Sequence, residues 1–340
     1  MQGIYREIQK EYDDNRKRAL DEAQAKKDAV YKEHPELKEV DDEINKIGVS
    51  MSKAIIFIDN DAVRNAKIEE LKKNINELKD KKAKILKKLK LTEEYFEPVF
   101  TCNVCQDTGT VGSLEGAKLC NCFRQKIINH TYNKTQMYII DKENFDTFDE
   151  KVFSDKVDEK RYKSEKSPRE NILNIKKRSE EFVEKFSDED NKNLIFIGGT
   201  GLGKTFMSNC IAKAAIDSGK TVLYQTAGKL MDMVMDYRMN RDNGEIDATE
   251  YNELFEVDLL IIDDLGTENV TEARLSELFN IINTRLINGK KKGIRTLIST
   301  NKELKDLMSY YDQRIVSRIL GNFDVYRFFG EDIRLKTSGK

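Results

Sequence analysis

The sequence predicts an α/β fold, in which a parallel sheet carries a nucleotide-binding loop and is preceded by a helical arm and a small zinc-binding module. Two buried strands are expected at 194–197 and 259–262, because both stretches are wholly apolar and mostly branched. A glycine-rich turn follows the first stretch and two aspartates follow the second. A long heptad pattern and a cluster of cysteines precede both.

The composition limits the classes of protein to consider. A length of 340 residues allows two or three domains, and 39% hydrophobic with 35% charged residues is a soluble, helix-rich balance. No apolar run of about 18 residues occurs, and residues 1–10 lack the apolar centre of a signal peptide. We therefore expect a cytoplasmic protein that does not bind membranes. The net charge of -2 means that any contact with nucleic acid must be local.

Residues 1–95 predict a helical arm. A first helix should end near Pro35, because proline disfavours helix in the residue before it. Two heptad seams follow, at Leu37, Val40, Ile44, Ile47, Met51, Ala54 and Ile58, and at Ile68, Leu71, Ile75, Leu78, Ile85 and Leu89. The polar break at 59–61 predicts an antiparallel hairpin. The arm is either a solvated spacer or a partner-binding segment, and the sequence does not separate these.

Residues 96–140 predict a zinc-binding module. Two cysteine pairs, Cys102 with Cys105 and Cys120 with Cys122, flank a small hairpin with Gly109 and Gly112. Four thiolates can close a tetrahedral Zn²⁺ site, and such a closed site is structural because no ligand position stays open. The second pair is C-x-C, which is shorter than the usual C-x-x-C spacing.

Residues 141–193 predict a linker that ends in an amphipathic helix at 171–186, and residues 194–340 predict the ATPase domain. The turn after the first strand fits the phosphate-binding motif G-x-x-x-x-G-K-[ST]. Its backbone N–H groups suit phosphates, its lysine suits the β and γ phosphates, and its hydroxyl suits Mg²⁺. The residues concerned are Gly198, Gly199, Thr200, Gly201, Leu202, Gly203, Lys204 and Thr205.

Carboxylates and late polar residues complete the expected site. Asp263 and Asp264 end the second buried strand, so we expect Asp263 to hold Mg²⁺ and Asp264 to orient or deprotonate the attacking water. Asn301 follows a further strand at 296–300 and suits the γ-phosphate or the water. Arginines follow at 314, 318 and 334, and a guanidinium suits the charge of a transferring phosphoryl group, also from a neighbouring subunit.

These motifs, in this order and spacing, resemble the AAA+ ATPases of the bacterial helicase-loader family, DnaC and DnaI. The resemblance covers about residues 95–335 and rests on 198–205, 259–266, 299–301, 314–319 and 328–334. It implies that Asn301 is the sensor 1 residue, Arg334 the sensor 2 arginine, and Arg314 the arginine finger in preference to Arg318. It also implies ATP as ligand and self-association through the ATPase domain. The implied task is to place a DnaB-type replicative helicase on single-stranded DNA, with ATP as the switch.

Two departures and two rival functions accompany this resemblance. Asp264 stands where the wider AAA+ pattern has Glu, which predicts slow hydrolysis, and the heptad arm has no confident match in the family. One rival is an IstB-type helper ATPase of DNA transposition, against which the cysteines and the arm argue. The other is an adaptor that binds nucleotide without hydrolysing it, against which Lys204, Asp263 and Arg314 argue.

Overall fold

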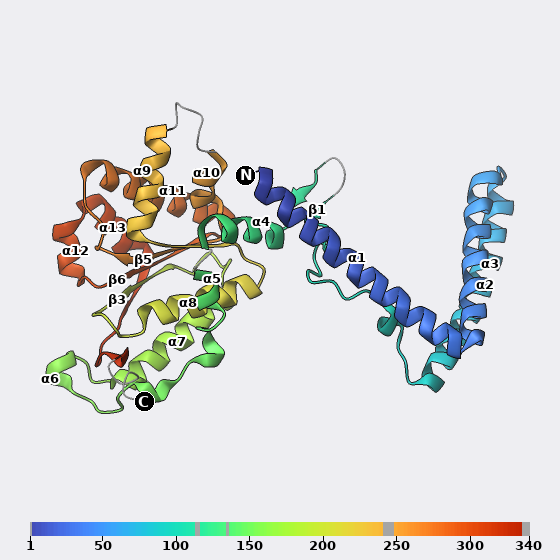
Figure 1. Cartoon of the computed structure of the whole chain (residues 1–340), viewed down its shortest axis with the longest axis horizontal. Helices are drawn as coiled ribbons and strands as arrows, with labels where there is room; N and C mark the ends of the chain where they lie inside the picture. The colour runs from blue at the N-terminus through green and yellow to red at the C-terminus, as the bar shows by residue number, and fades with distance from the viewer. Residues whose placement is uncertain (1, 113–115, 134–135, 241–247, 335–340) are drawn as a thin grey trace. The chain divides into compact units, whose positions relative to one another are not determined.

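A computed structural model describes residues 2–112, 116–133, 136–240 and 248–334 of the chain (Figure 1). The chain divides into two compact units, and each is considered by itself. One comprises Gln9–Ala117, and the other comprises Met1–Ile8 together with Lys118–Lys340. Within the described ranges, no helix combines the length and the apolar character needed to cross a membrane.

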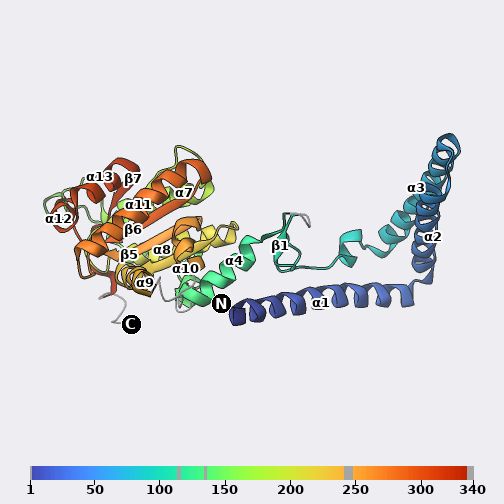
Figure 2. The ribbon, with the colours of Figure 1, turned by 90° about the horizontal axis from the view of Figure 1, so that it is seen from above.

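The first unit is built from long helices, as the heptad pattern predicted. Helix α1 (Gln2–Glu33) begins in the other unit and is followed by α2 (Pro35–Phe57), α3 (Asp61–Leu89) and the short η1 (Glu93–Phe96). Helices α2 and α3 lie side by side in both views (Figures 1 and 2), which confirms the hairpin. Asn60 begins α3 by accepting hydrogen bonds from the N–H groups of Ala62 and Val63.

Several seam residues of α2 and α3 are buried. They include Leu37, Val40 and Ala54 of α2 and Leu71 and Leu86 of α3. The hairpin also has a polar contact, because the Lys82 ammonium lies 2.9 Å from the carboxylate of the buried Asp41. The expected apolar seam therefore exists, and an ion pair between the half-buried Lys82 and the buried Asp41 interrupts it.

A five-stranded parallel sheet forms the centre of the second unit. The strands are β3 (Asn193–Ile197), β4 (Val222–Thr226), β5 (Leu259–Leu265), β6 (Arg295–Thr300) and β7 (Phe323–Arg327), in the order β4-β5-β6-β3-β7. Every neighbouring pair is parallel. This sheet confirms the predicted fold class. Strand β7 was not among the expected strands.

Helices cover both faces of this sheet (Figure 1). Leu194 and Phe196 of β3 pack with the helices α7 (Pro168–Glu184) and α8 (Lys204–Asp217). The intervening Ile195 and Ile197 pack on the opposite face, with α9 (Ala227–Asn240), α11 (Glu272–Lys292) and α13 (Gln313–Asn322). Because successive strand residues point to opposite faces, an unbroken apolar strand fills two cores at once.

The remaining elements of the chain are shorter. Helices α10 (Ala248–Glu256) and α12 (Leu304–Tyr310) belong to the ATPase domain. Short elements precede it: β1 (Thr110–Val111), β2 (Lys118–Leu119), α4 (Asn121–Ile128), η2 (Asn129–Asn133), α5 (Gln136–Ile140), η3 (Phe145–Thr147), η4 (Glu150–Val152) and α6 (Glu159–Tyr162). Strands β1 and β2 pair as the small hairpin expected between the cysteines.

The helix predicted at 171–186 starts and ends earlier than expected. Ser167 accepts a hydrogen bond from the N–H of Glu170, and the Glu170 carboxylate accepts one from the N–H of Ser167. This reciprocal cap, followed by Pro168 at the first helical position, fixes the start of α7. The apolar spacing predicted the buried face of the helix, and the cap determines where it begins.

Candidate nucleotide-binding site

The phosphate-binding loop joins the end of β3 to the start of α8, as predicted. Gly198 has φ of +145°, and a Cβ placed there would lie 2.2 Å from the carbonyl oxygen of Phe328. Any side chain at this position would therefore displace the backbone that follows β7. Lys204 begins α8, so the N–H groups of the first helical turn face the loop.

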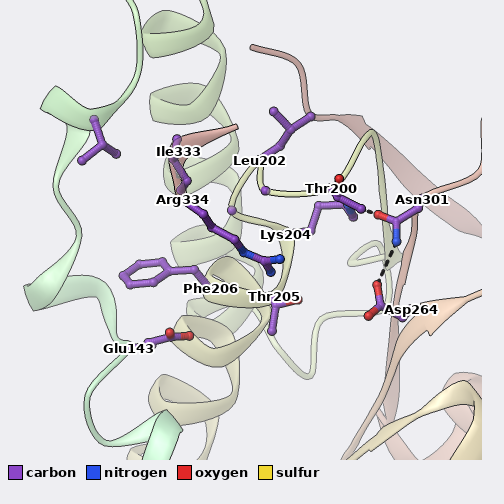
Figure 3. A pocket seen from close by; sticks show the side chains of 13 residues that line it. Glu143, Thr200, Leu202, Lys204, Thr205, Phe206, Asp264, Asn301, Ile333 and Arg334 are labelled. Carbon is purple, nitrogen blue, oxygen red and sulfur yellow. Dashed lines mark hydrogen bonds between the residues drawn. The ribbon is translucent and has the colours of Figure 1, made fainter. Parts of the chain in front are cut away.

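The loop borders a cavity of about 420 Å³ (Figure 3). Most of the predicted site residues line it, namely Thr200, Gly201, Leu202, Gly203, Lys204, Thr205, Asp264, Asn301 and Arg334. Gly198, Gly199 and Asp263 contact lining residues without lining the cavity. Arg314 does not line it. The structure thus brings together residues that follow β3 and β6, a residue near the end of β5 and a residue of the C-terminal segment.

Lys204 is buried and held by three oxygen atoms. Its Nζ donates to the carbonyl oxygens of Gly198, at 2.8 Å, and Gly199, at 2.7 Å, and to Oδ1 of Asn301, at 2.6 Å. Burial lowers the pKa of the ammonium, and the carboxylates of Asp264 and Asp263 act in the opposite direction. The predicted phosphate lysine and the predicted sensor amide are therefore in direct contact.

Asp263 accepts hydrogen bonds from three hydroxyl groups. Thr205 Oγ1 donates to its Oδ2 at 3.2 Å, and Tyr224 donates to the same atom at 2.9 Å. Ser299 of β6 donates to Oδ1. Burial and the nearby Asp263 carboxylate hold the pKa of Tyr224 well above its usual range, so this phenol stays a donor. A threonine hydroxyl beside a carboxylate is a suitable oxygen pair for Mg²⁺.

Asp264 points into the cavity because the backbone changes direction there. The pairing of β5 with β6 is irregular between Ile262 and Leu265, and Asp264 has a left-handed φ of +56°. Its Oδ1 accepts a hydrogen bond from Asn301 Nδ2 at 3.2 Å (Figure 3). Burial raises the pKa of the Asp264 carboxyl, and Asp263 raises it further. Neighbouring carboxylates thus serve different partners, since Asp263 contacts Thr205 and Asp264 faces the cavity.

The three late arginines occupy different environments. Arg334 lines the cavity, and the adjacent Ile333 donates its N–H to the carbonyl of Gly201 at 2.9 Å. Arg314 pairs with Asp312 at 2.8 Å, with its side chain 65% exposed. Arg318 donates to Asn283 Oδ1 at 2.9 Å. The position of Arg334 suits a ligand of its own subunit, and the exposure of Arg314 leaves it accessible to a neighbouring molecule.

Four lining residues had not been expected from the sequence: Glu143, Val152, Phe206 and Ile333. Phe206 directly follows the phosphate-binding motif and Ile333 precedes Arg334, so adjacency to the predicted residues was an available signal. Glu143 and Val152 belong to the connector at 141–193, where no motif marks a ligand-facing residue. Only the folded chain brings them to the cavity.

The four predicted zinc ligands form one group. One sulfur atom from each of Cys102, Cys105, Cys120 and Cys122 lies within 4.8 Å of all the others. The first pair sits on a tight turn, in which the buried Asp107 accepts the N–H groups of Thr101 and Cys102, both at 2.9 Å. Four soft thiol donors at this spacing fit a tetrahedral zinc ion.

The parallel sheet, the phosphate-binding loop after β3 and the two carboxylates of β5 define a P-loop nucleotide-binding protein of the AAA+ class. A family model described as IstB-like ATP binding protein matches residues 167–340. Because that match spans half of the chain, the chain belongs to the IstB-like ATP-binding protein family. The site residues at 198–205, 263–264, 301 and 334 all lie within the matched region.

Curated relatives include replicative helicase loaders. The chain is 26% identical over 172 residues to the replicative helicase loader DnaC of Escherichia coli strain K12, covering 50% of this chain and 67% of the relative. It is 30% identical over 166 residues to the DnaC of Buchnera aphidicola subsp. Baizongia pistaciae, covering 47% and 63% of the two chains. A crystal structure of the DnaC helicase loader aligns at 22% identity with a TM-score of 0.44, covering 56% of this chain and 99% of that one. The curated relatives confirm the resemblance drawn from the motifs.

Proposed function

We propose that this protein is an ATP-dependent helicase loader, which uses ATP binding and hydrolysis to place a DnaB-type replicative helicase on single-stranded DNA. One observation carries the proposal: Lys204, Thr205, Asp264, Asn301 and Arg334 meet at a single cavity. These five residues lie within 167–340, the region that the family model matches, and the chain's relatives include proteins named helicase loaders. The relatives named here share about half of this chain, so the loading task itself is inferred from their names.

The residues of the cavity have complementary roles in the proposed reaction. Lys204 and the N–H groups of the loop bind the phosphates of ATP, and Arg334 adds positive charge from the C-terminal segment. Thr205 and Asp263 are the residues that would hold Mg²⁺, which when bound neutralises phosphate charge. Asp264 accepts a proton from the attacking water, and Asn301 orients that water. We expect slow turnover, because the aspartate reaches less far than the usual glutamate.

The cysteine group would hold Zn²⁺ as a structural ion. Its four thiolate ligands would fix the turn at 102–107 and the start of α4, and no ligand position would remain for chemistry. We expect about one zinc per purified chain. Elemental analysis should find that Cys120→Ser loses most of it, whereas Cys210→Ala, which removes a buried core thiol, retains it. A zinc content unchanged by Cys120→Ser would contradict the assignment.

The proposal extends to partners and location. The helical arm at 1–95 would hold the helicase, and the ATPase domain would sense nucleotide and DNA. Copies of the chain would associate through the ATPase domain, with Arg314 reaching the nucleotide of the neighbouring subunit. All of these steps would take place in the cytoplasm.

The test measures helicase loading and nucleotide binding together. A DnaB-type hexamer is mixed with the full chain, ATP and a circular single-stranded DNA, and the helicase retained on the DNA is quantified. Lys204→Ala should lower nucleotide affinity at least about tenfold and abolish ATP-dependent retention, because charge-assisted phosphate contacts are lost. Lys213→Ala is the matched control, since Lys213 lies on the same helix and pairs with Asp217 on the exposed surface.

Two outcomes would favour the rival functions. Retention of a transposase instead of a helicase would indicate a transposition helper, which the name of the matched family keeps in view. Unchanged helicase retention by Lys204→Ala would indicate an adaptor that needs no nucleotide switch.

A further inference from the structure

Glu143 occupies the side of the cavity away from the catalytic carboxylate. In Figure 3 it lies near Phe206, opposite Asn301 and Asp264. The phosphate-binding loop and Asp264 define the end of the cavity that suits the γ-phosphate. A nucleotide bound there directs its base toward the opposite side, where Glu143 is the acidic lining residue.

A chain of amide groups fixes the orientation of the Glu143 carboxylate. Gln136 Nε2 donates to Asn209 Oδ1 at 3.0 Å, so the amide nitrogen of Asn209 points away from Gln136 and toward Glu143. That nitrogen donates to Oε2 of Glu143 at 2.6 Å. Asn209 is fully buried and lies one turn after Thr205 on α8, so the rigid helix that carries the phosphate loop also positions Glu143. Among the described residues, Oε1 of Glu143 has no hydrogen-bond donor.

The walls around Glu143 suit an aromatic base. Val152, Phe206 and Ile333 line the same cavity and offer apolar surface. Phe206 packs against Phe148, with ring centroids 6.2 Å apart. Apolar walls beside a single oriented polar group are typical of small-molecule subsites that bind a ring and read one of its edges. Ribose and phosphate are polar and suit such walls less well than a base does.

We propose that Glu143 determines base specificity by accepting a hydrogen bond from the exocyclic amino group of adenine. The inference deepens the proposed function, because it assigns the base-reading residue of the same ATP site. An ionised carboxylate only accepts hydrogen bonds. Adenine places a donor at its 6-position, whereas hypoxanthine and guanine place an acceptor oxygen there. A carboxylate that faces the 6-position therefore attracts the amino group of adenine and repels the oxygen of the other two bases.

Because of the Asn209 contact, one variant of Glu143 should reverse the base preference. In Glu143→Gln, the side-chain oxygen accepts from Asn209, which leaves the amide nitrogen as a donor facing the cavity. This variant should prefer a base with an oxygen at the 6-position. Glu143→Ala should bind both bases alike, because it presents neither group.

Calorimetric titration of the full chain with nucleoside diphosphates provides the measurement, because diphosphates are not consumed. The wild-type chain should bind ADP at least about tenfold more tightly than IDP. The ratio should fall to about one in Glu143→Ala and below about one in Glu143→Gln. Glu150→Gln, an exposed change in the same connector, should keep the wild-type ratio.

Further outcomes separate this inference from its alternatives. A preference for ADP that survives in both Glu143 variants overturns it, as does tighter binding of IDP by the wild-type chain. Glu143 would instead be a ribose contact if the wild-type chain bound 2′-deoxy-ADP much more weakly than ADP while the Glu143 variants kept the wild-type ratio of ADP to IDP affinity. Base selection through Glu143 without helicase retention would overturn only the proposed function. Failure of both diphosphates to bind would overturn both proposals.

Discussion

The backbone at Asp264 explains why aspartate suits this position. A left-handed φ is strained for most residues, and aspartate and asparagine adopt it more readily than longer side chains do. The irregular pairing between Ile262 and Leu265 turns the chain so that Asp264 faces the cavity while Asp263 reaches Thr205. The departure from the usual glutamate is therefore tied to local geometry, and slow hydrolysis is its expected consequence.

We expect Asp264→Asn to raise the thermal stability of the nucleotide-free chain slightly while abolishing hydrolysis. Asparagine keeps the left-handed backbone favourable and removes the repulsion from Asp263. The pKa of Asp264 is raised in the folded state. The charged carboxylate therefore destabilises the fold at pH values above this folded-state pKa, and this cost disappears at pH values below the pKa of the unfolded chain. The Tm advantage of the variant, about 1–3 °C at neutral pH, should therefore shrink as the pH falls.

The control for this prediction is Asp306→Asn, an exposed change on α12, which should leave Tm within about 1 °C at every pH. If the stability advantage of Asp264→Asn instead grew as the pH fell, the folded-state pKa of Asp264 would be lowered and not raised.

Single residues differ in how well the sequence predicted them. Lys204, Thr205 and Asp264 follow from short motifs, because each sits beside a strand end that the apolar pattern marks. Glu143 could not be predicted, because its place depends on Asn209 and on how the connector packs against α8. Arg314 and Arg334 could be named as candidates, and the fold then distinguishes an exposed residue from a cavity-lining one.

At the scale of elements, one side chain completes the edge of the sheet. Strand β4 is an outer strand, and the buried Gln125 of α4 lies beside it. Its Nε2 donates to the carbonyl of Val222 at 3.0 Å, and its Oε1 accepts the N–H of Val222 at 2.5 Å. The amide thus occupies the place that a sixth strand would take. A bidentate ion pair between Arg124 and Glu253 holds the same helix.

Gln125→Leu should lower the free energy of unfolding by about 1–3 kcal/mol, because both bonds to a buried strand edge are lost without replacement. Chemical denaturation of the full chain measures this. The control is Lys229→Leu on α9, the helix that follows β4, where an exposed side chain is changed and the cost should stay under about 0.5 kcal/mol. Equal effects of the two substitutions would contradict the role assigned to Gln125.

Elements with strong apolar patterns were predicted well, and those fixed by tertiary contacts were not. The unbroken apolar runs of β3 and β5 predicted central strands, because both of their faces are buried. Strand β7 is short and mixed in polarity, and it exists because β3 offers it a parallel edge. Likewise, α4 could be placed only once the edge of β4 was known.

At the scale of the whole molecule, Arg314 lies outside the cavity of its own chain. Its guanidinium pairs with Asp312 and lies 5.0 Å from the centre of the Phe279 ring. A nucleotide site completed by Arg314 requires a second copy of the chain. On assembly, the Arg314 guanidinium would leave Asp312 and pair with the phosphate of the nucleotide bound by the neighbouring copy.

Mixing two inactive variants tests this arrangement. Lys204→Ala and Arg314→Ala should each lack ATPase activity, and an equal mixture should recover up to about one quarter of it. About one interface in four then joins an intact phosphate loop to an intact arginine. Arg318→Ala, which removes the contact with Asn283, should remain active alone. No recovery on mixing, with Arg314→Ala fully active, would place the finger elsewhere.

The order of the strands also sets when the site can form during synthesis. Strand β3, which carries the phosphate loop, pairs with β6 and β7, and both follow it by about a hundred residues or more. A nascent chain that has emerged only as far as Asp264 therefore has the motif without its neighbours. The cavity is complete only after Arg334, which follows β7, has left the ribosome, so we expect early folding to depend on the helices and on apolar collapse. Chains truncated before Phe323 should accordingly be targets for chaperones and proteases.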